Sequence, residues 1–150
     1  EKELRPLLTA VRDEAGGTPV FVKIAPDLDD AGIQSVCSLV VDLGLAGIVA
    51  TNTTVGRSGL ITPNDRVEEM GDGGLSGAPL AERAEEVLRF IRQTLPRNIA
   101  VISVGGVFTG RDVQDRLDAG ANLVQAYTGF VYRGPLFAAH LTQELMGTRN

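Results

Sequence analysis

The chain has 150 residues, a length usual for one domain, and 43% of them are hydrophobic, which is enough for a substantial core. A net charge of −5 argues against nucleic acid as a partner, because phosphate backbones are bound by clustered Lys and Arg. One Cys and one His exclude an internal disulfide and a Cys/His zinc site, and no apolar run approaches the ~20 residues of a membrane span.

The first part of the chain alternates between helical and strand periodicity. We expect a helix over residues 1–15, with an apolar face made by Leu4, Leu7, Leu8 and Val11. The β-branched and aromatic run 20–24 (VFVKI) predicts a strand, and Asp29 or Asp30 can cap the helix that follows. The apolar stripe of this second helix comprises Ile33, Val36, Cys37, Val40 and Val41. Residues 46–50 (AGIVA) form the second expected strand.

The middle of the chain, from about Thr51 to Gly77, is polar and rich in Gly and has no clear period. Loops of this length inside a compact domain are usually lids or binding loops. A helix opened by Pro79 follows. Its inward-facing residues are expected to be Leu80, Ala84, Val87, Leu88, Ile91 and Leu95.

Two further strand–helix units complete the pattern, with strands over 98–104 and 121–126 and helices over 110–119 and 135–146. Repeated β/α units predict an α/β fold with a parallel sheet and right-handed crossovers. The strands are almost continuously apolar, as expected for strands buried on both faces.

Two architectures fit this pattern: an open doubly wound sheet, or four β/α units that make half of a TIM (β/α)8 barrel. A complete barrel takes roughly 250 residues. Because four units occupy 150 residues and the pattern opens on a helix, we expect an N-terminal half outside this chain.

Each expected strand ends in glycine or in polar side chains. The four ends are residues 23–26, 51–54, 104–107 and 125–128. In a β/α barrel, reactive residues lie at the C-terminal ends of the strands. Four such ends in order along the chain therefore predict a shared site.

The first two strand ends carry the reactive side chains. Lys23 is either a lysine that reaches the surface from a strand end, a cation held against an anionic ligand, or a Schiff-base amine. Thr51, Asn52 and Thr53 either form a plain turn or donate and accept hydrogen bonds at the edge of a ring.

Glycines dominate the remaining candidate positions. One Gly-Gly pair alone is usually a turn, but two pairs placed at strand and helix ends favour a phosphate site built from backbone amides. The pairs are Gly73-Gly74, in a segment that ends at Gly77, and Gly105-Gly106. In barrels the phosphate is commonly held by the last two strand–loop units.

Five segments taken together resemble the dihydroorotate dehydrogenases, in the order and spacing of that family. They are VKIAPDL (22–28), ATNTT (50–54), GGLSG-PL (73–80), ISVGGV (102–107), and LVQAYTG followed by YRGP (123–135). The resemblance runs from about Pro19 to the end. It implies a TIM (β/α)8 barrel, of which this chain is the C-terminal half, that binds FMN. The family oxidises dihydroorotate to orotate in pyrimidine (UMP) biosynthesis.

The resemblance also implies a role for each matched residue. Lys23 would stabilise negative charge on the reduced flavin, and Tyr127 would act through its backbone rather than its phenol. The implied FMN-binding residues are Lys23, Thr51, Gly77, Gly106, Tyr127 and Thr128. The implied substrate-binding residues are Asn52 and Thr53.

The segments IAPDL and NTT resemble the quinone-dependent class of the family. That class uses a serine base, which is expected upstream of this chain, so neither Ser58 nor Ser76 is assigned that role. The quinone site and the membrane-docking helices are also expected outside the chain. The class implies a peripheral protein on the cytoplasmic face of a bacterial membrane, or on the mitochondrial inner membrane. Cys37 is interpreted as a core residue and His140 as structural or surface.

Three alternatives remain open from the residues themselves. The chain could belong to a soluble-class dihydroorotate dehydrogenase or to a dihydropyrimidine dehydrogenase. It could belong to a phosphate-binding lyase or aldolase that uses Lys23 as a Schiff-base amine. Finally, half a barrel would expose two sheet edges and could act only as a dimerising module.

Overall fold

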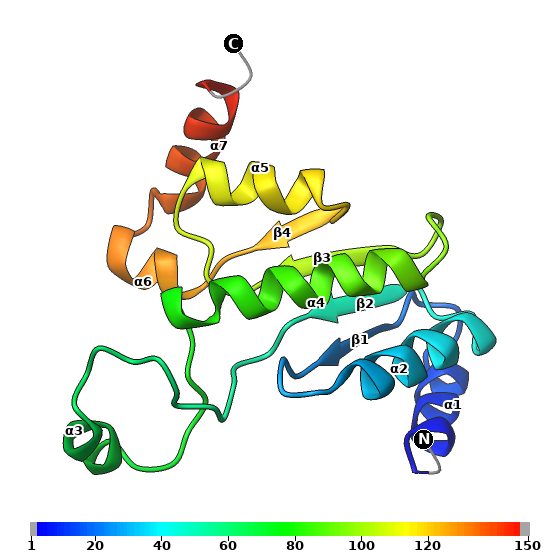
Figure 1. Cartoon of the computed structure of the whole chain (residues 1–150). Helices are drawn as coiled ribbons and strands as arrows, with labels where there is room; N and C mark the ends of the chain where they lie inside the picture. The colour runs from blue at the N-terminus through cyan, green and yellow to red at the C-terminus, as the bar shows by residue number, and fades with distance from the viewer. Residues whose placement is uncertain (1–2, 148–150) are drawn as a thin grey trace.

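A computed structural model of the chain describes residues 3–147 and contains a parallel sheet with helices packed against it (Figure 1). The strands are β1 (Phe21–Ile24), β2 (Gly47–Ala50), β3 (Ala100–Val104) and β4 (Leu123–Gln125). The helices are α1 (Leu4–Glu14), α2 (Asp30–Asp42), α3 (Asn64–Glu69), the 3₁₀ helix η1 (Ala78–Leu80), α4 (Ala81–Thr94), α5 (Gly110–Asp118), α6 (Thr128–Arg133) and α7 (Phe137–Gly147). The expected strands and helices are confirmed within residues 3–147, whereas α3 and α6 were not foreseen. Residues 1–2 of the first expected helix lie outside the described residues.

The sheet has the strand order β1-β2-β3-β4, with every neighbouring pair parallel. In Figure 1, α4 lies in front of β2 and β3, α2 lies below β1 and α5 above β4. α2 contacts β2, α4 contacts β2 and β3, and α5 contacts β4. A doubly wound sheet would need a reversal of strand order and helices on both faces. Consecutive order with helices on one face is instead the winding of a β/α barrel.

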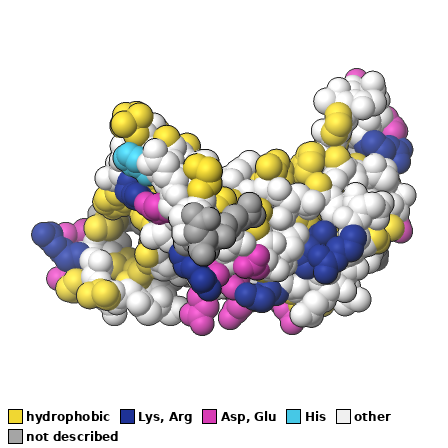
Figure 2. Space-filling model, turned by 90° about the horizontal axis from the view of Figure 1, so that it is seen from above, with side chains coloured by type: hydrophobic (Ala, Val, Ile, Leu, Met, Phe, Trp, Pro, Cys, Tyr) yellow, Lys and Arg dark blue, Asp and Glu magenta, His cyan; other side chains and the backbone are white. Residues whose placement is uncertain are grey.

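Only one face of the sheet is buried within residues 3–147. Ile48, Ala50 and Val101 point toward the helices and are fully buried. Along the opposite face, Lys23 and Leu123 are exposed. The prediction of strands buried on both faces was therefore wrong for this chain, because helices cover only one side. Figure 2 shows the molecule from above. Its outline is a crescent, and charged side chains gather along the convex lower side.

The helical faces match the sequence pattern to different degrees. All six inward residues expected for the segment opened by Pro79 are buried. In α2, Leu39 is fully buried and Val41 is 46% exposed, so the buried arc is rotated relative to the expected stripe. In α1, Leu8 is buried while Leu7 and Val11 are exposed. α1 lies below the edge strand β1 in Figure 1 and contacts the core through Leu8 and the partly buried Leu4.

Candidate functional site

The C-terminal ends of the four strands surround one cavity of about 570 Å³. All eight residues singled out from the sequence line it, although they come from segments more than 100 residues apart. They are Lys23, Thr51, Asn52, Thr53, Gly77, Gly106, Tyr127 and Thr128. Parallel strands in consecutive order bring these segments together, since their carboxyl ends meet at one edge of the sheet.

Lys23 supplies the charge of the cavity at the end of β1. It is the one charged side chain among the lining residues, and it has no hydrogen-bond or ion-pair partner within residues 3–147. A cavity wall with a cation and no carboxylate favours a ligand that carries or develops negative charge.

Thr51 lies where β2 enters the cavity wall, after a cis peptide bond from Ala50. Its amide donates to the Val104 carbonyl at 2.8 Å. The side chain is only 2% exposed, and its Oγ1 has no hydrogen-bond partner in the described part of the chain. A buried hydroxyl without a partner is costly, so this atom is suited to a ligand that completes its hydrogen bonding.

Asn52 and Thr53 are exposed at the mouth of the cavity. The Asn52 amide donates to the Ile24 carbonyl at 2.7 Å, which ties this turn to the end of β1. A Cβ built on Gly74 would lie 1.9 Å from Thr53 Oγ1, so only glycine lets the returning loop pass this closely. Asn52 and Thr53 thus line the same cavity as Lys23, on its open side.

The loop between β2 and η1 is braced near its base. Thr54 Oγ1 donates to Asp27 Oδ1 at 2.5 Å, and Thr54 forms an antiparallel bridge with Leu75. The guanidinium of Arg57 donates to the Gly73 carbonyl. Sequence reasoning missed Asp27 and Arg57 as positioning residues; the only signal was that Asp27 belongs to the IAPDL segment.

At the β3–β4 end the cavity is lined largely by backbone. Gly77 and Gly106 have φ values of +83° and +70°, which favour glycine. A Cβ on Gly106 would lie 2.3 Å from Ala81 Cα, so this turn packs directly on the start of α4. The backbone amides of Gly77, Gly106, Tyr127 and Thr128 have no acceptor within residues 3–147. These amides can therefore be offered to an anion.

Ser76 and Phe108 also line the cavity at this end, although the sequence did not single them out as ligand contacts. Thr128 Oγ1 donates to Ser76 Oγ at 2.9 Å, which links the loop before η1 to the start of α6. By contrast, the ring of Tyr127 is 78% exposed.

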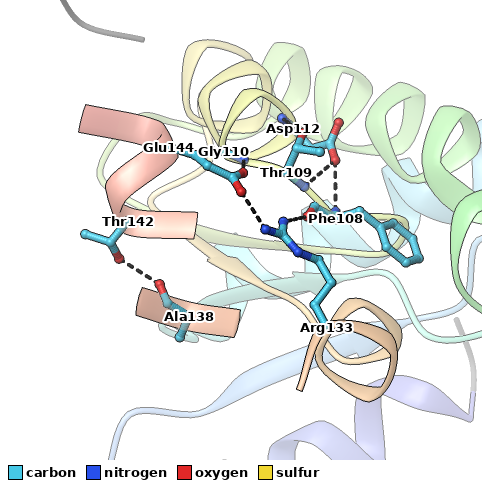
Figure 3. A network of polar contacts seen from close by, with 8 residues as sticks. All are labelled: Phe108, Thr109, Gly110, Asp112, Arg133, Ala138, Thr142 and Glu144. Carbon is cyan, nitrogen blue, oxygen red and sulfur yellow. Dashed lines mark hydrogen bonds and ion pairs between the residues drawn. The ribbon is translucent and has the colours of Figure 1, made fainter. Parts of the chain in front are cut away.

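The first turn of α5, close to the cavity, is already occupied by carboxylates of the chain (Figure 3). Asp112 accepts from the amides of Phe108 and Thr109 at 2.8 Å each, and Thr109 completes a capping box. Glu144 of α7 accepts from the Gly110 amide at 2.6 Å. These amides are therefore not available to a ligand.

Arg133 completes the network drawn in Figure 3. It donates to the Phe108 carbonyl and to Glu144 Oε1, the latter at 2.5 Å, and its guanidinium lies 5.3 Å from the centre of the Phe137 ring. The hydrogen bond from Arg133 is the main reason that the pKa of Glu144 is lowered, and the Gly110 amide adds to the effect. This network holds α7 against the loop that follows β3.

Cys37 and His140 lie away from the cavity. Cys37 lies on α2, is 1% exposed and belongs to the hydrophobic core. Burial raises the pKa of its thiol to about 11. This confirms it as a core residue. His140 is half-buried on α7. Among residues 3–147, no three His, Cys, Asp or Glu side chains lie close enough together to hold a metal ion.

Comparison with known sequences gives consistent matches. A family model described as dihydroorotate dehydrogenase matches residues 1–148. The dihydroorotate dehydrogenase (quinone) of Clavibacter sepedonicus is 59% identical over 146 residues, which are 97% of this chain and 42% of that protein. That of Mycobacterium ulcerans is 54% identical over 140 residues, or 93% of this chain and 38% of that protein. The chain thus spans about two fifths of the length of these curated relatives.

Solved structures give the same picture. The ligand-free DHODH from Eimeria tenella aligns with a TM-score of 0.87 at 30% identity, over 97% of this chain and 45% of that one. The DHODH from the same organism in complex with ferulenol aligns with a TM-score of 0.80 at 35% identity, over 87% of this chain and 34% of that one. These neighbours are TIM barrels, so the four β/α units correspond to part of such a barrel.

Proposed function

Since this chain belongs to the dihydroorotate dehydrogenase family, we propose that the full-length protein oxidises dihydroorotate to orotate with FMN as cofactor and a quinone as electron acceptor. This reaction is a step in de novo pyrimidine biosynthesis. The observation that carries the proposal is the cavity itself. It combines a cation, a buried hydroxyl and four backbone amides that have no partner in the described part of the chain.

The two ends of the cavity suit the two ends of FMN. Gly77, Gly106, Tyr127 and Thr128 offer amides without acceptors, and such groups bind phosphate oxygens. Thr51 Oγ1 is an orphaned hydroxyl that a flavin ring atom would satisfy. Bound there, FMN would supply the two-electron acceptor for the oxidation.

Lys23, Asn52 and Thr53 would act on the ring side. The Lys23 ammonium, which no carboxylate within residues 3–147 neutralises, would stabilise negative charge that develops on the ring system. Asn52 both donates and accepts hydrogen bonds, and with the Thr53 hydroxyl it would orient the planar substrate at the open side of the cavity. The proposed contribution of this chain is therefore to bind FMN and to orient the substrate.

The remaining machinery is proposed to lie in the part of the protein outside this chain. That part would contain the N-terminal half of the barrel, a serine base, the quinone site and helices that dock on the membrane. It would make this chain the C-terminal half of the FMN-binding barrel. The protein would then be peripheral to the bacterial cell membrane on its cytoplasmic face.

No helix within residues 3–147 has the length and hydrophobicity needed to cross a bilayer.

The decisive experiment uses the purified full-length protein. We expect it to be yellow, to release FMN on denaturation, and to consume dihydroorotate when a quinone is supplied. Fumarate or a nicotinamide should not replace the quinone. Turnover with either of those acceptors but not with quinones would favour the soluble-class alternative, and a folded but colourless protein would refute FMN as the cofactor.

A further inference from the structure

A buried arginine lies directly behind the glycine turn of the cavity. Arg116 of α5 is 2% exposed. Its Nη2 donates to the Ala81 carbonyl at 2.6 Å and to the Gly105 carbonyl at 3.1 Å, while Nη1 donates to Ser103 Oγ at 3.3 Å. All three acceptors are uncharged, and no carboxylate within residues 3–147 accepts a hydrogen bond from this guanidinium.

Keeping this cation out of water is unfavourable. Burial lowers the pKa of Arg116, and the more distant carboxylates of Glu85 and Asp112 only partly oppose that effect. Buried charges in proteins are normally paired or engaged with a ligand. Packing alone would be served better by an apolar side chain, so the guanidinium calls for a role that uses its hydrogen bonds and its charge.

The hydrogen bond to Gly105 has a direct consequence for the cavity. The Gly105 carbonyl and the Gly106 amide belong to one trans peptide group, in which C=O and N–H point in opposite directions. Because Arg116 holds the Gly105 carbonyl on the α5 side, the Gly106 N–H points away from Arg116. Gly106 itself lines the cavity and Arg116 does not, so we infer that this N–H is presented to the cavity.

Without Arg116 the orientation of this peptide would be poorly defined. Gly105 and Gly106 have φ values of +124° and +70° and carry no side chains that could hold the turn. The second acceptor, the Ala81 carbonyl, belongs to the residue on which Gly106 packs. One guanidinium therefore fixes both sides of the contact between the glycine turn and the start of α4.

We propose that Arg116 is a positioning residue for the phosphate of the cofactor, holding the Gly106 amide toward the cavity and placing a positive charge behind it. This inference rests on the proposed FMN function. The charged residue that lines the cavity, Lys23, lies on β1, at the opposite end from the phosphate. The positive charge near the phosphate would therefore come from Arg116, which does not line the cavity.

The test compares two flavins that differ only in the phosphate. Dissociation constants of FMN and riboflavin are measured on the full-length apoprotein by flavin fluorescence, together with thermal unfolding. Arg116→Met should weaken FMN at least tenfold and leave riboflavin within about twofold, so that the preference for FMN collapses. Arg116→Lys keeps the charge but not the planar fork, and should lose part of that preference. Arg111→Met, on the exposed side of the same helix, should change neither constant.

A merely structural role gives a different result, because it weakens both flavins equally along with thermal stability. That pattern, or an unchanged FMN constant in Arg116→Met, would overturn the proposal. If Arg116→Met does not fold, the Arg116→Lys variant provides the test. If that variant prefers FMN over riboflavin as strongly as the wild type does, the proposed role of Arg116 is refuted. Wild-type protein that binds neither flavin would contradict the proposed function instead, so the two failures are distinguishable.

Discussion

The two ends of the cavity are built on opposite principles. At the β1–β2 end, the polar groups that line the cavity are the side chains of Lys23, Thr51, Asn52 and Thr53. At the β3–β4 end, they are mainly backbone amides around Gly77, Gly106 and Thr128. A side chain can be exchanged without moving its neighbours, whereas a backbone amide can be moved only by moving the chain. We therefore expect substitutions at the first end to alter chemistry and substitutions at the second to alter structure.

The supports of the two ends differ in the same way. Lys23 has no partner within residues 3–147, and Asn52 is exposed. The β3–β4 end is held from behind by Arg116 and from the side by Arg133 with Glu144. If the proposed function holds, the groups at the first end stay unpaired within residues 3–147 until the ligand binds. The backbone proposed to bind the phosphate is fixed in advance, which lowers the free-energy cost of binding.

The largest expected effect is at the backbone end. Gly106→Ala would place a Cβ 2.3 Å from Ala81 Cα at a positive φ. Left-handed backbone costs an L-residue roughly 1–2 kcal/mol and overpacking about 1–3 kcal/mol, so the free energy of unfolding should fall by about 2–5 kcal/mol. Chemical denaturation of the full-length apoprotein measures this loss. Gly44→Ala is the matched control, because Gly44 has a φ of +65° and no atom lies within 4 Å of the new Cβ. This variant should lose only the roughly 1–2 kcal/mol that comes from the left-handed backbone. Equal losses in the two variants would contradict the packing argument.

The next effect belongs to the side-chain end. Lys23→Met should lower turnover of the full-length enzyme by about 10²–10³-fold, the usual cost of removing one group that stabilises developing charge. Unfolding free energy and FMN content should hardly change, because Lys23 is exposed and makes no ion pair within residues 3–147. Lys23→Arg keeps the charge and serves as the control.

Unchanged turnover in Lys23→Met would refute the role given to this lysine. A substrate adduct that borohydride traps and that mass spectrometry maps to Lys23 would support the Schiff-base alternative.

A smaller effect with opposite signs is expected at Thr51. Thr51→Val removes a buried hydroxyl that has no partner, so the apoprotein should be unchanged or more stable by about 1 kcal/mol. FMN should bind about tenfold more weakly, equivalent to about 1.4 kcal/mol. Calorimetry and flavin titration measure the two quantities. Thr142→Val on α7 is the control, and a loss of apoprotein stability at Thr51 would show that the hydroxyl has a protein partner instead.

The smallest effect is a pH dependence at the backbone end. In the folded protein Arg133 and the Gly110 amide hold the pKa of Glu144 below its ordinary value of 4.5. A lowered pKa means that this carboxylate stabilises the fold above its unfolded-state pKa, and that the contribution disappears as pH falls through the folded-state value. Glu144→Gln should thus melt slightly below wild type at neutral pH, and the two melting curves should converge in acid. Glu69→Gln, which affects an exposed ion pair with Arg66, controls for net charge. A difference that persists at low pH would refute the linkage.

The sequence predicted the residues that line the cavity better than the residues that hold them in place. Lys23, Thr51 and Gly106 could be recognised because each interrupts an apolar strand or lies within two residues of its end, which is a local signal. Arg116 gave no such signal, since an arginine in an amphipathic helix is expected on the solvent side. Its burial depends on acceptors 11 and 35 residues away, at Gly105 and Ala81.

The same difference between local and long-range signals explains where the sequence prediction of the fold was wrong. The buried face of α4 follows from its own periodicity, because the helix is packed along its whole length. The rotated face of α2 and the exposed face of α1 depend on where their neighbours lie, and so does the unforeseen α6, a helix of six residues. Short helices are stabilised by tertiary contacts rather than by their own sequence.

By itself, the sequence determined the α/β class, the positions of the strands, and the residues that occupy the four strand ends. Tertiary structure alone decided the consecutive strand order, the single helix-covered face, and the pairing of each polar atom. The physical reason is range: periodicity and turn chemistry act over a few neighbouring residues, whereas strand order and the fate of a buried guanidinium or hydroxyl are settled by groups distant in the chain.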